Sequence, residues 1–263
     1  MKLNKRVTGF LVPLLGAAAI AFCTAQPANA GFVSFVIRNS PTIAPGPGGT
    51  TDFIIAAAGD KAALGSSDIN GTTLGNITSL GIVRTDDRTR FSAGSGPYVA
   101  PYLNFWITDG SGHFAVVANE PSDANFQSLY NNGYQLSFGD LSNKVAKIYE
   151  NSDKSWLPNN GIGLTFADLS NFVIQAPTIA QLNVGWAGLS SGAPRELGTN
   201  VAYGVNWVFG DTLSNYVSGD TGYLVKNAEV ATAATAAVPE PGVLMLFGLG
   251  LVGIGLSRRK KAA

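Results

Sequence analysis

The chain has 263 residues and no net charge, and only 13% of its residues are charged, about half the usual share. Residues 31–237 hold 10 Lys or Arg against 16 Asp or Glu, without a basic run, which argues against nucleic acid and anionic membrane surfaces as partners. The one cysteine is Cys23, so residues 31–237 can form neither a disulfide nor a thiolate metal site.

Residues 1–30 have the three parts of a secretory signal peptide. Basic residues come first, an apolar run covers 7–22, and a short polar stretch leads to small residues at Ala28 and Ala30. This A-x-A pattern predicts that signal peptidase cuts after Ala30, so that the mature protein begins at Gly31. The alternative, a permanent N-terminal anchor, would need a longer apolar span.

The body, residues 31–230, is predicted to be all-β. Its many glycines and its aromatic and β-branched residues, with few Lys and Glu, favour strands joined by turns. The clearest hairpin joins 102–108 to 113–118 through Asp109-Gly110-Ser111-Gly112. Further strands are expected at Phe32–Arg38, Thr51–Ala57, Ile77–Arg84, Tyr134–Phe138, Val145–Tyr149, Phe172–Gln175, Leu182–Trp186 and Gly222–Val230, and short helices at Asn125–Tyr130 and Asp211–Tyr216.

The aromatic residues before this turn alternate with aliphatic ones. In an extended segment, Tyr98, Tyr102 and Trp106 point to one face, while Leu103 and Ile107 point to the other. If the aliphatic face is core, the aromatic face is either open, where its rings could bind a carbohydrate ligand by stacking, or covered by a second layer as ordinary core. The covered arrangement is the one we expect.

His113 is the only histidine, and it directly follows the hairpin turn. A turn does not hold Ser111 as an oriented nucleophile, so we interpret His113 as a structural residue and assign no catalytic residue. One histidine without a body cysteine also leaves no zinc site. Calcium is the cation that acidic loops could bind. The interpretation we adopt by default is that these Asp side chains stabilise turns. The acidic residues concerned are Asp86, Asp87, Asp109, Asp140, Asp168, Asp211 and Asp220.

A strand with a period of two is expected near the end of the body. Val201, Tyr203, Val205, Trp207 and Phe209 alternate with smaller or polar residues, which predicts a core-facing side. About ten short strands with glycine-rich turns, and no repeat of fixed period, predict a single β-sandwich, jelly-roll-like in kind.

The C-terminal region changes character after residue 230. Residues 231–237 contain only Ala and Thr, a composition that indicates a linker. Residues 238–263 form a separate tail. Within the tail, Pro239-Glu240-Pro241 precedes fifteen uncharged residues, 242–256, with five glycines, and a basic cluster that begins with Arg258 and Arg259 follows. A helix over 242–256 would be about 22 Å long, a weak transmembrane span. The basic cluster predicts a cytoplasmic C-terminus.

This combination of Pro-Glu-Pro, a short apolar helix and a terminal Arg/Lys cluster resembles the PEP-CTERM sorting signal of bacteria. The resemblance covers about residues 238–261. It implies that exosortase, an integral-membrane cysteine protease, recognises and removes the tail, and that the host usually makes exopolysaccharide.

The leading hypothesis is an exported, non-enzymatic protein of the cell surface or extracellular matrix. Its precursor is expected in the inner membrane, with signal peptidase and exosortase as processing partners, and its role is expected to be structural or adhesive in association with exopolysaccharide and biofilm. The first alternative is a carbohydrate-binding, lectin-like module, which needs an exposed aromatic face. A polysaccharide-active hydrolase is the second, and it needs two carboxylates facing each other across a cleft.

Overall fold

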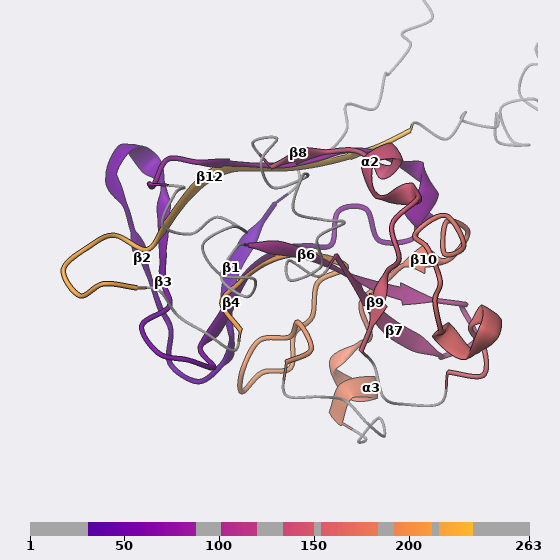
Figure 1. Ribbon diagram of the computed structural model, residues 1–263. Coiled ribbons are helices and arrows are strands. Elements are labelled where there is room, and N and C mark those ends of the chain that lie inside the picture. The colour runs from indigo at the N-terminus through magenta and orange to yellow at the C-terminus, as the bar shows by residue number, and fades with distance from the viewer. Residues whose placement is uncertain are drawn as a thin grey trace, which may run out of the picture.

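The structure is a computed structural model, and it describes residues 31–87, 101–119, 134–149, 154–183, 192–211 and 216–233. The predicted signal peptide, the helix at 125–130, most of the helix at 211–216, and the tail lie outside these residues. The described body consists mainly of β-strands with a few short helices (Figure 1). The all-β prediction is therefore confirmed.

The strands form two sheets, and every pairing between named strands is antiparallel. The seven-stranded sheet has the order β1 (Val33–Arg38), β4 (Lys61–Ser66), β11 (Val205–Phe209), β6 (Tyr102–Thr108), β7 (Phe114–Ala118) and β9 (Lys147–Ile148), with β10 (Val173–Ile174) also paired to β6. The five-stranded sheet has the order β2 (Thr42–Pro45), β3 (Thr51–Ile54), β12 (Tyr223–Thr232), β5 (Ile77–Arg84) and β8 (Gln135–Leu136). Short helices are α2 (Phe138–Ser142), α3 (Ile179–Asn183), η1 (Pro47–Gly49), η2 (Leu74–Asn76) and η4 (Pro158–Gly161).

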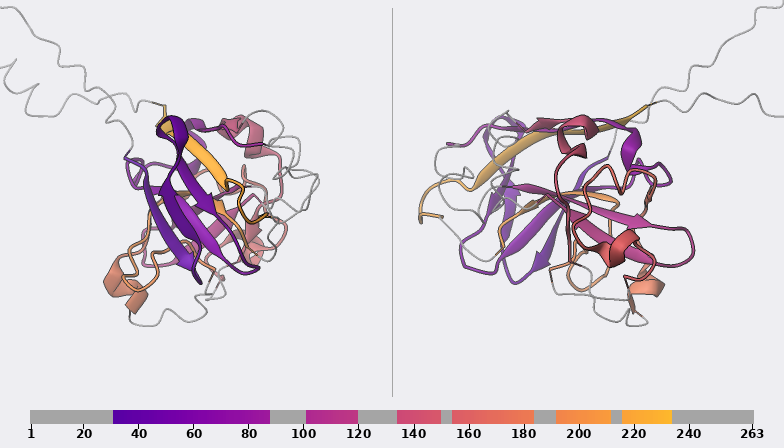
Figure 2. Two further views of the ribbon diagram at one scale, coloured as in Figure 1. Left: turned by 90° about the vertical axis from the view of Figure 1, so that its left-hand side faces the viewer. Right: turned by 45° about the vertical axis from the view of Figure 1, so that its right-hand side comes forward.

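Eight of the strands pair in a regular scheme, in which the four that come earlier in the chain pair with the four that come later. β3 pairs with β12, β4 with β11, β5 with β8, and β6 with β7. Two further pairings, β12 with β5 and β11 with β6, join these ladders into the two sheets. From β3 to β6 the chain therefore alternates between the two sheets (Figure 2).

One hydrophobic cluster takes side chains from both sheets. Phe209 of β11 stacks on Phe53 of β3 with ring centroids 4.1 Å apart, and Tyr134 meets Trp207 of β11 edge-on at 5.8 Å. Phe53, Trp207 and Phe209 are fully buried. Because burying a large apolar side chain contributes about 1.5–3 kcal/mol, these contacts hold the two sheets together.

Most of the predicted strands are confirmed. β5 begins and ends as predicted, β6 and β7 form the predicted hairpin, and strands are present within the ranges expected for β1, β3, β8, β9 and β10. β11 is shorter than predicted and begins at Val205, although Val205, Trp207 and Phe209 do face the core. β12 continues to Thr232, two residues into the predicted linker.

The strand predicted at Leu182–Trp186 is wrong in its described part, because α3 covers Ile179–Asn183; residues 184–186 lie outside the described residues. The backbone N–H of Thr178 donates to Oε1 of Gln181 at 2.8 Å, and the Gln181 N–H donates back to Oγ1 of Thr178 at 3.3 Å. These reciprocal bonds satisfy amides at the helix start. The strands β2 and β4 were not predicted.

Candidate functional site

The aromatic face of β6 is covered at its centre. Trp106 is fully buried, and its indole N–H donates to the carbonyl oxygen of Pro194 at 2.9 Å. It packs in a second cluster with Phe114, Val116, Ala176 and Ala193. The open-face arrangement is therefore wrong for Trp106, whose ring has no surface available for a sugar. Tyr98 lies outside the described residues.

Tyr102, on the same face of β6, is also buried and belongs to a polar cluster with Lys61, Tyr149, Asp211 and Arg38, the Lys61 cluster. Lys61 Nζ lies 5.6 Å from the ring centroid of Tyr102 and 5.9 Å from that of Tyr149. It donates to the carbonyl of Gly192 at 3.1 Å and lies 3.8 Å from Asp211 Oδ1. The buried ammonium is thus compensated by a carboxylate, a carbonyl and two ring faces.

The remaining members of this cluster bind Asp211. Arg38 Nη2 lies 3.1 Å from Asp211 Oδ1, and the Tyr102 hydroxyl donates to Oδ2 at 3.4 Å. The Arg38–Asp211 pair is partly exposed, with about a quarter of each side chain accessible. Together these contacts hold the chain at Gly192 and at Asp211 against the outer face of the seven-stranded sheet.

Two asparagines lie opposite each other in the centre of this face. Asn104 of β6 and Asn206 of β11 are register partners, and both are fully buried. Asn104 Nδ2 donates to the Tyr149 hydroxyl at 2.8 Å, and Asn206 Nδ2 donates to the Tyr203 carbonyl at 2.7 Å. Their Oδ1 atoms accept no hydrogen bond from described protein atoms.

A second polar cluster, the Arg84 cluster, lies in the five-stranded sheet. The Arg84 guanidinium lies between the rings of Tyr134 and Tyr223, 5.1 and 5.2 Å from their centroids. It pairs with Asp86 through both carboxylate oxygens, and Nη1 donates to the Tyr134 hydroxyl at 2.7 Å. Burial alone would lower the pKa of Arg84, but Tyr134 and Asp86 outweigh burial and raise that pKa above its ordinary value.

Asp52 lies on β3 near this cluster and is buried. Its Oδ1 accepts the backbone N–H of Gly222 at 2.9 Å. Burial raises the pKa of Asp52 above its ordinary value, the Gly222 hydrogen bond opposes the rise, and the negative charge of Asp86 adds to it. A carboxyl with a raised pKa is often part of a functional site, but here it packs within a structural network.

Five of the acidic residues considered for calcium bind other protein groups: Asp86, Asp109, Asp140, Asp168 and Asp211. Asp140 accepts from the backbone and hydroxyl of Ser137, and Asp168 does the same with Thr165, whose hydrogen bonds lower the pKa of Asp168. Asp86 and Asp211 bind the arginines named above. In the parts of the chain that the structure describes, no three His, Cys, Asp or Glu side chains come together to hold a metal ion.

His113 is oriented by a residue of its own turn. Its Nδ1 lies 2.8 Å from Asp109 Oδ2, and Asp109 Oδ1 accepts the backbone N–H of Ser111 at 2.8 Å. Burial by itself would raise the pKa of Asp109, but these hydrogen bonds together hold that pKa below its ordinary value. The His113 ring stacks on Trp156 at 5.9 Å. These contacts close the hairpin.

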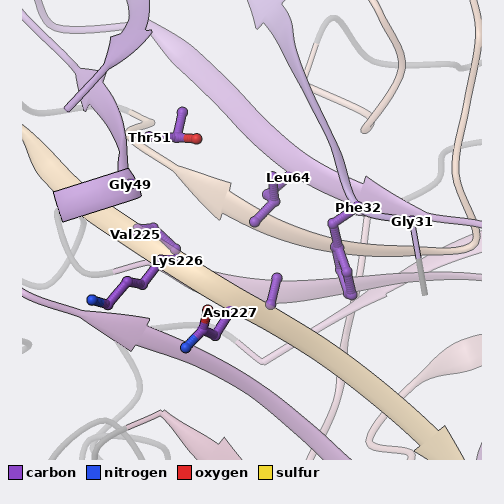
Figure 3. Close-up of a pocket in the computed structure, with 9 residues that line it drawn as sticks. Gly31, Phe32, Gly49, Thr51, Leu64, Val225, Lys226 and Asn227 are labelled. Carbon is purple, nitrogen blue, oxygen red and sulfur yellow. The ribbon is translucent and has the colours of Figure 1, made fainter. Parts of the chain in front are cut away.

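A groove of about 440 Å³ opens between the two sheets. In Figure 3, Phe32 and Leu64 lie on one side of it, and Val225 and Lys226 of β12 lie along the other. Its polar side chains are those of Thr51, Lys226 and Asn227. With one titratable group in its lining, the groove has no pair of groups for acid–base chemistry.

The sorting and processing residues named from the sequence lie outside the described residues: Ala28, Ala30, Pro239, Glu240, Pro241, Arg258 and Arg259. No helix among the described residues is long and apolar enough to cross a membrane.

Comparison with protein families supports the C-terminal assignment. The model of the PEP-CTERM protein-sorting motif matches residues 237–260. Neither the curated proteins nor the solved structures give a match to the chain. The chain therefore carries a PEP-CTERM protein-sorting motif at its C-terminal end, the mark of an exported protein that exosortase processes.

Proposed function

We propose that this chain is a non-enzymatic protein of the cell surface or extracellular matrix, with a structural or adhesive role in association with exopolysaccharide. The observation that carries the proposal is the PEP-CTERM motif at 237–260, which follows shortly after the last strand of the body. The link to exopolysaccharide and biofilm rests on what this motif implies about the host.

The proposed maturation has two cleavages. Signal peptidase cuts after Ala30, and residues 242–256 hold the precursor in the inner membrane with the basic cluster in the cytoplasm. Exosortase then cuts near Pro239-Glu240-Pro241. A span of fifteen residues with five glycines is a weak membrane anchor, which suits a segment that is removed.

We infer that the body is a single β-sandwich of the jelly-roll kind. A jelly roll has eight strands in two packed antiparallel sheets. The strand orders β3-β12-β5-β8 and β4-β11-β6-β7 supply these eight strands, with early strands paired to late ones. The cluster that takes side chains from both sheets supports their packing face to face.

The non-enzymatic role is supported by how the polar residues are used. His113 and Asp109 close a hairpin, Asp140 and Asp168 bond to the backbone of their own turns, and Arg84 is enclosed with Asp86. In each case, the hydrogen bonds serve the fold. Because Trp106 and Tyr102 are buried, the carbohydrate-binding alternative loses two of the three rings on which it was based.

The test is fractionation of the host culture. A strain that lacks this gene is complemented with the full chain, and cells, exopolysaccharide and medium are separated. We expect processed protein in the exopolysaccharide fraction, its release when a glycosidase degrades the polymer, and poorer polymer retention in the deletion strain. Processed protein that stays soluble in the medium, with unchanged polymer retention, would contradict the proposal.

A further inference from the structure

Both ends of the described body are fastened to one segment, residues 67–76, which connects β4 to β5. The backbone N–H of Gly31 donates to Asp68 Oδ2 at 2.7 Å, and the N–H of Ala233 donates to the carbonyl of Asn76 at 2.8 Å. In both views of Figure 2, the indigo start and the yellow end of the coloured ribbon accordingly lie on the same side of the body. We call the surface formed by Gly31, segment 67–76 and Ala233 the tether face.

The chain between the tether face and each apolar segment is short. Eight residues, 23–30, separate the apolar run 7–22 from Gly31, and eight residues, 234–241, separate Ala233 from the apolar stretch 242–256. Even when fully extended, eight residues span at most about 30 Å. An anchored precursor therefore keeps Gly31 and Ala233 within about 30 Å of the membrane surface.

The body is too large to turn over on such a tether. A compact domain of about 200 residues has a radius of gyration of about 17 Å, so the body is about 40 Å across and about 65 Å around half its circumference. A tether of at most about 30 Å cannot follow the surface to the opposite side. After the signal peptide has been removed, the C-terminal tether alone is short enough to keep the body from turning over.

We propose that the tether face is the surface that the precursor holds toward the inner membrane until exosortase cuts the tail, so that the opposite end of the body projects outward. The inference rests on the proposed anchoring of the tail in the membrane. It adds an orientation, and it identifies the loop before β12, which lies at the far end of that strand from Ala233 (Figure 1), as the outward surface.

The charge of the tether face suits this position. Asp68 is the only charged residue between Lys61 and Arg84, and its carboxylate accepts the Gly31 N–H. Hydrolysis of the bond between Ala30 and Gly31 adds one water, leaves a carboxylate on Ala30 and gives Gly31 an ammonium group that neutralises Asp68. The acidic body would otherwise be repelled by anionic lipid, and this face presents little net charge to it.

The experiment compares two single-cysteine precursors in a host without exosortase. Ser67→Cys places a probe on the tether face, and the matched variant Ser218→Cys places one in the loop before β12; both serines are exposed. Cys23 leaves with the signal peptide. Each cysteine carries an environment-sensitive fluorophore, and spin-labelled lipid headgroups quench it by proximity. We expect several-fold stronger quenching at position 67 than at position 218.

Two further measurements separate the possible failures. Inserting about 30 Gly/Ser residues into 234–237 lets the body turn freely, so the difference between the two positions should disappear. Equal quenching without the insert, in a precursor that does sediment with membranes, would overturn the orientation alone. A precursor absent from the membrane fraction would overturn both the orientation and the proposed anchoring.

Discussion

The indole N–H of Trp106 donates to the carbonyl oxygen of Pro194 at 2.9 Å, a contact between residues 88 positions apart in the chain. It fixes the segment at 192–194 over the outer face of β6. The ring that a carbohydrate-binding surface would need to expose is thus part of a second small core, packed with Phe114 and Val116.

Replacing Trp106 with Ala should destabilise the fold. The change removes a fully buried ring and leaves the Pro194 carbonyl without its donor, so we expect a loss of about 3–5 kcal/mol in the free energy of unfolding. Denaturant titration of the mature protein measures this loss. Trp156→Ala is the control, since Trp156 is only partly buried and should cost less. An unchanged unfolding midpoint for Trp106→Ala would show that the ring is not core.

Replacing Arg84 with Met should be far more costly than the same change at Arg38. Both side chains of the Arg84–Asp86 pair are 1% exposed, against 27% and 25% for Arg38 and Asp211. Arg84→Met leaves a buried carboxylate unpaired and should cost about 3–5 kcal/mol, whereas Arg38→Met should cost about 1 kcal/mol or less. Equal losses in urea titrations of the two variants would contradict the difference in burial.

Asp52→Asn should stabilise the protein at neutral pH. Because the folded state raises the pKa of Asp52, it binds a proton more tightly than the unfolded state does. The contribution of Asp52 to stability is therefore complete below its ordinary pKa and is lost as the pH rises through the raised pKa. Asn stays neutral and can still accept the Gly222 N–H.

Thermal melts from acidic to neutral pH test this sign. The melting temperature of Asp52→Asn should exceed that of the wild type at neutral pH, and the two should converge at acidic pH. Asp168→Asn is the opposite case, because hydrogen bonds from Thr165 lower the pKa of Asp168, and it should lose stability at neutral pH. A wild type that is more stable than Asp52→Asn at neutral pH would refute the raised pKa.

Comparing Gly210→Ala with Gly219→Ala should separate two costs of adding a Cβ atom, the strain of a positive φ and the steric clash with neighbouring atoms. Both glycines have positive φ, 76° and 93°. A Cβ at Gly210 would lie 2.5 Å from the Asp60 carbonyl oxygen, whereas one at Gly219 meets nothing within 4 Å. Gly219→Ala should cost about 1–2 kcal/mol, and Gly210→Ala clearly more, because backbone must move. Circular dichroism melts that show equal losses would refute the collision.

Local patterns in the sequence predicted much of the fold. β5 is rich in Ile and Val and lies between polar segments, so both of its ends were predicted. β4 was missed because its six residues, Lys61–Ser66, include no β-branched or aromatic side chain. Its small residues are required by tertiary packing, since a Cβ at Gly65 would lie 2.7 Å from Asn206 Oδ1. No pattern local to β4 contains that information.

The candidate site could be predicted only in part for the same reason. Alternation placed Trp106 and Leu103 on opposite faces of β6, and the two residues lie in different hydrophobic clusters. Whether the Trp106 face is open depends on residues near Pro194, far away in the sequence. The Lys61 cluster also combines distant segments, and a lysine at the start of a short apolar run gave no sign of it. The sorting motif, by contrast, is one continuous stretch of sequence, so it could be identified without knowledge of the fold.

The mass of the intact exported protein shows whether both the signal peptide and the C-terminal tail are removed. In a host with exosortase, we expect a product that begins at Gly31 and ends near Pro239-Glu240-Pro241, without the apolar stretch and the basic cluster. In the same host without the protease, the tail should remain and the protein should sediment with the inner membrane. An exported product that retains Arg258 and Arg259 in the presence of exosortase would contradict the proposed removal of the tail.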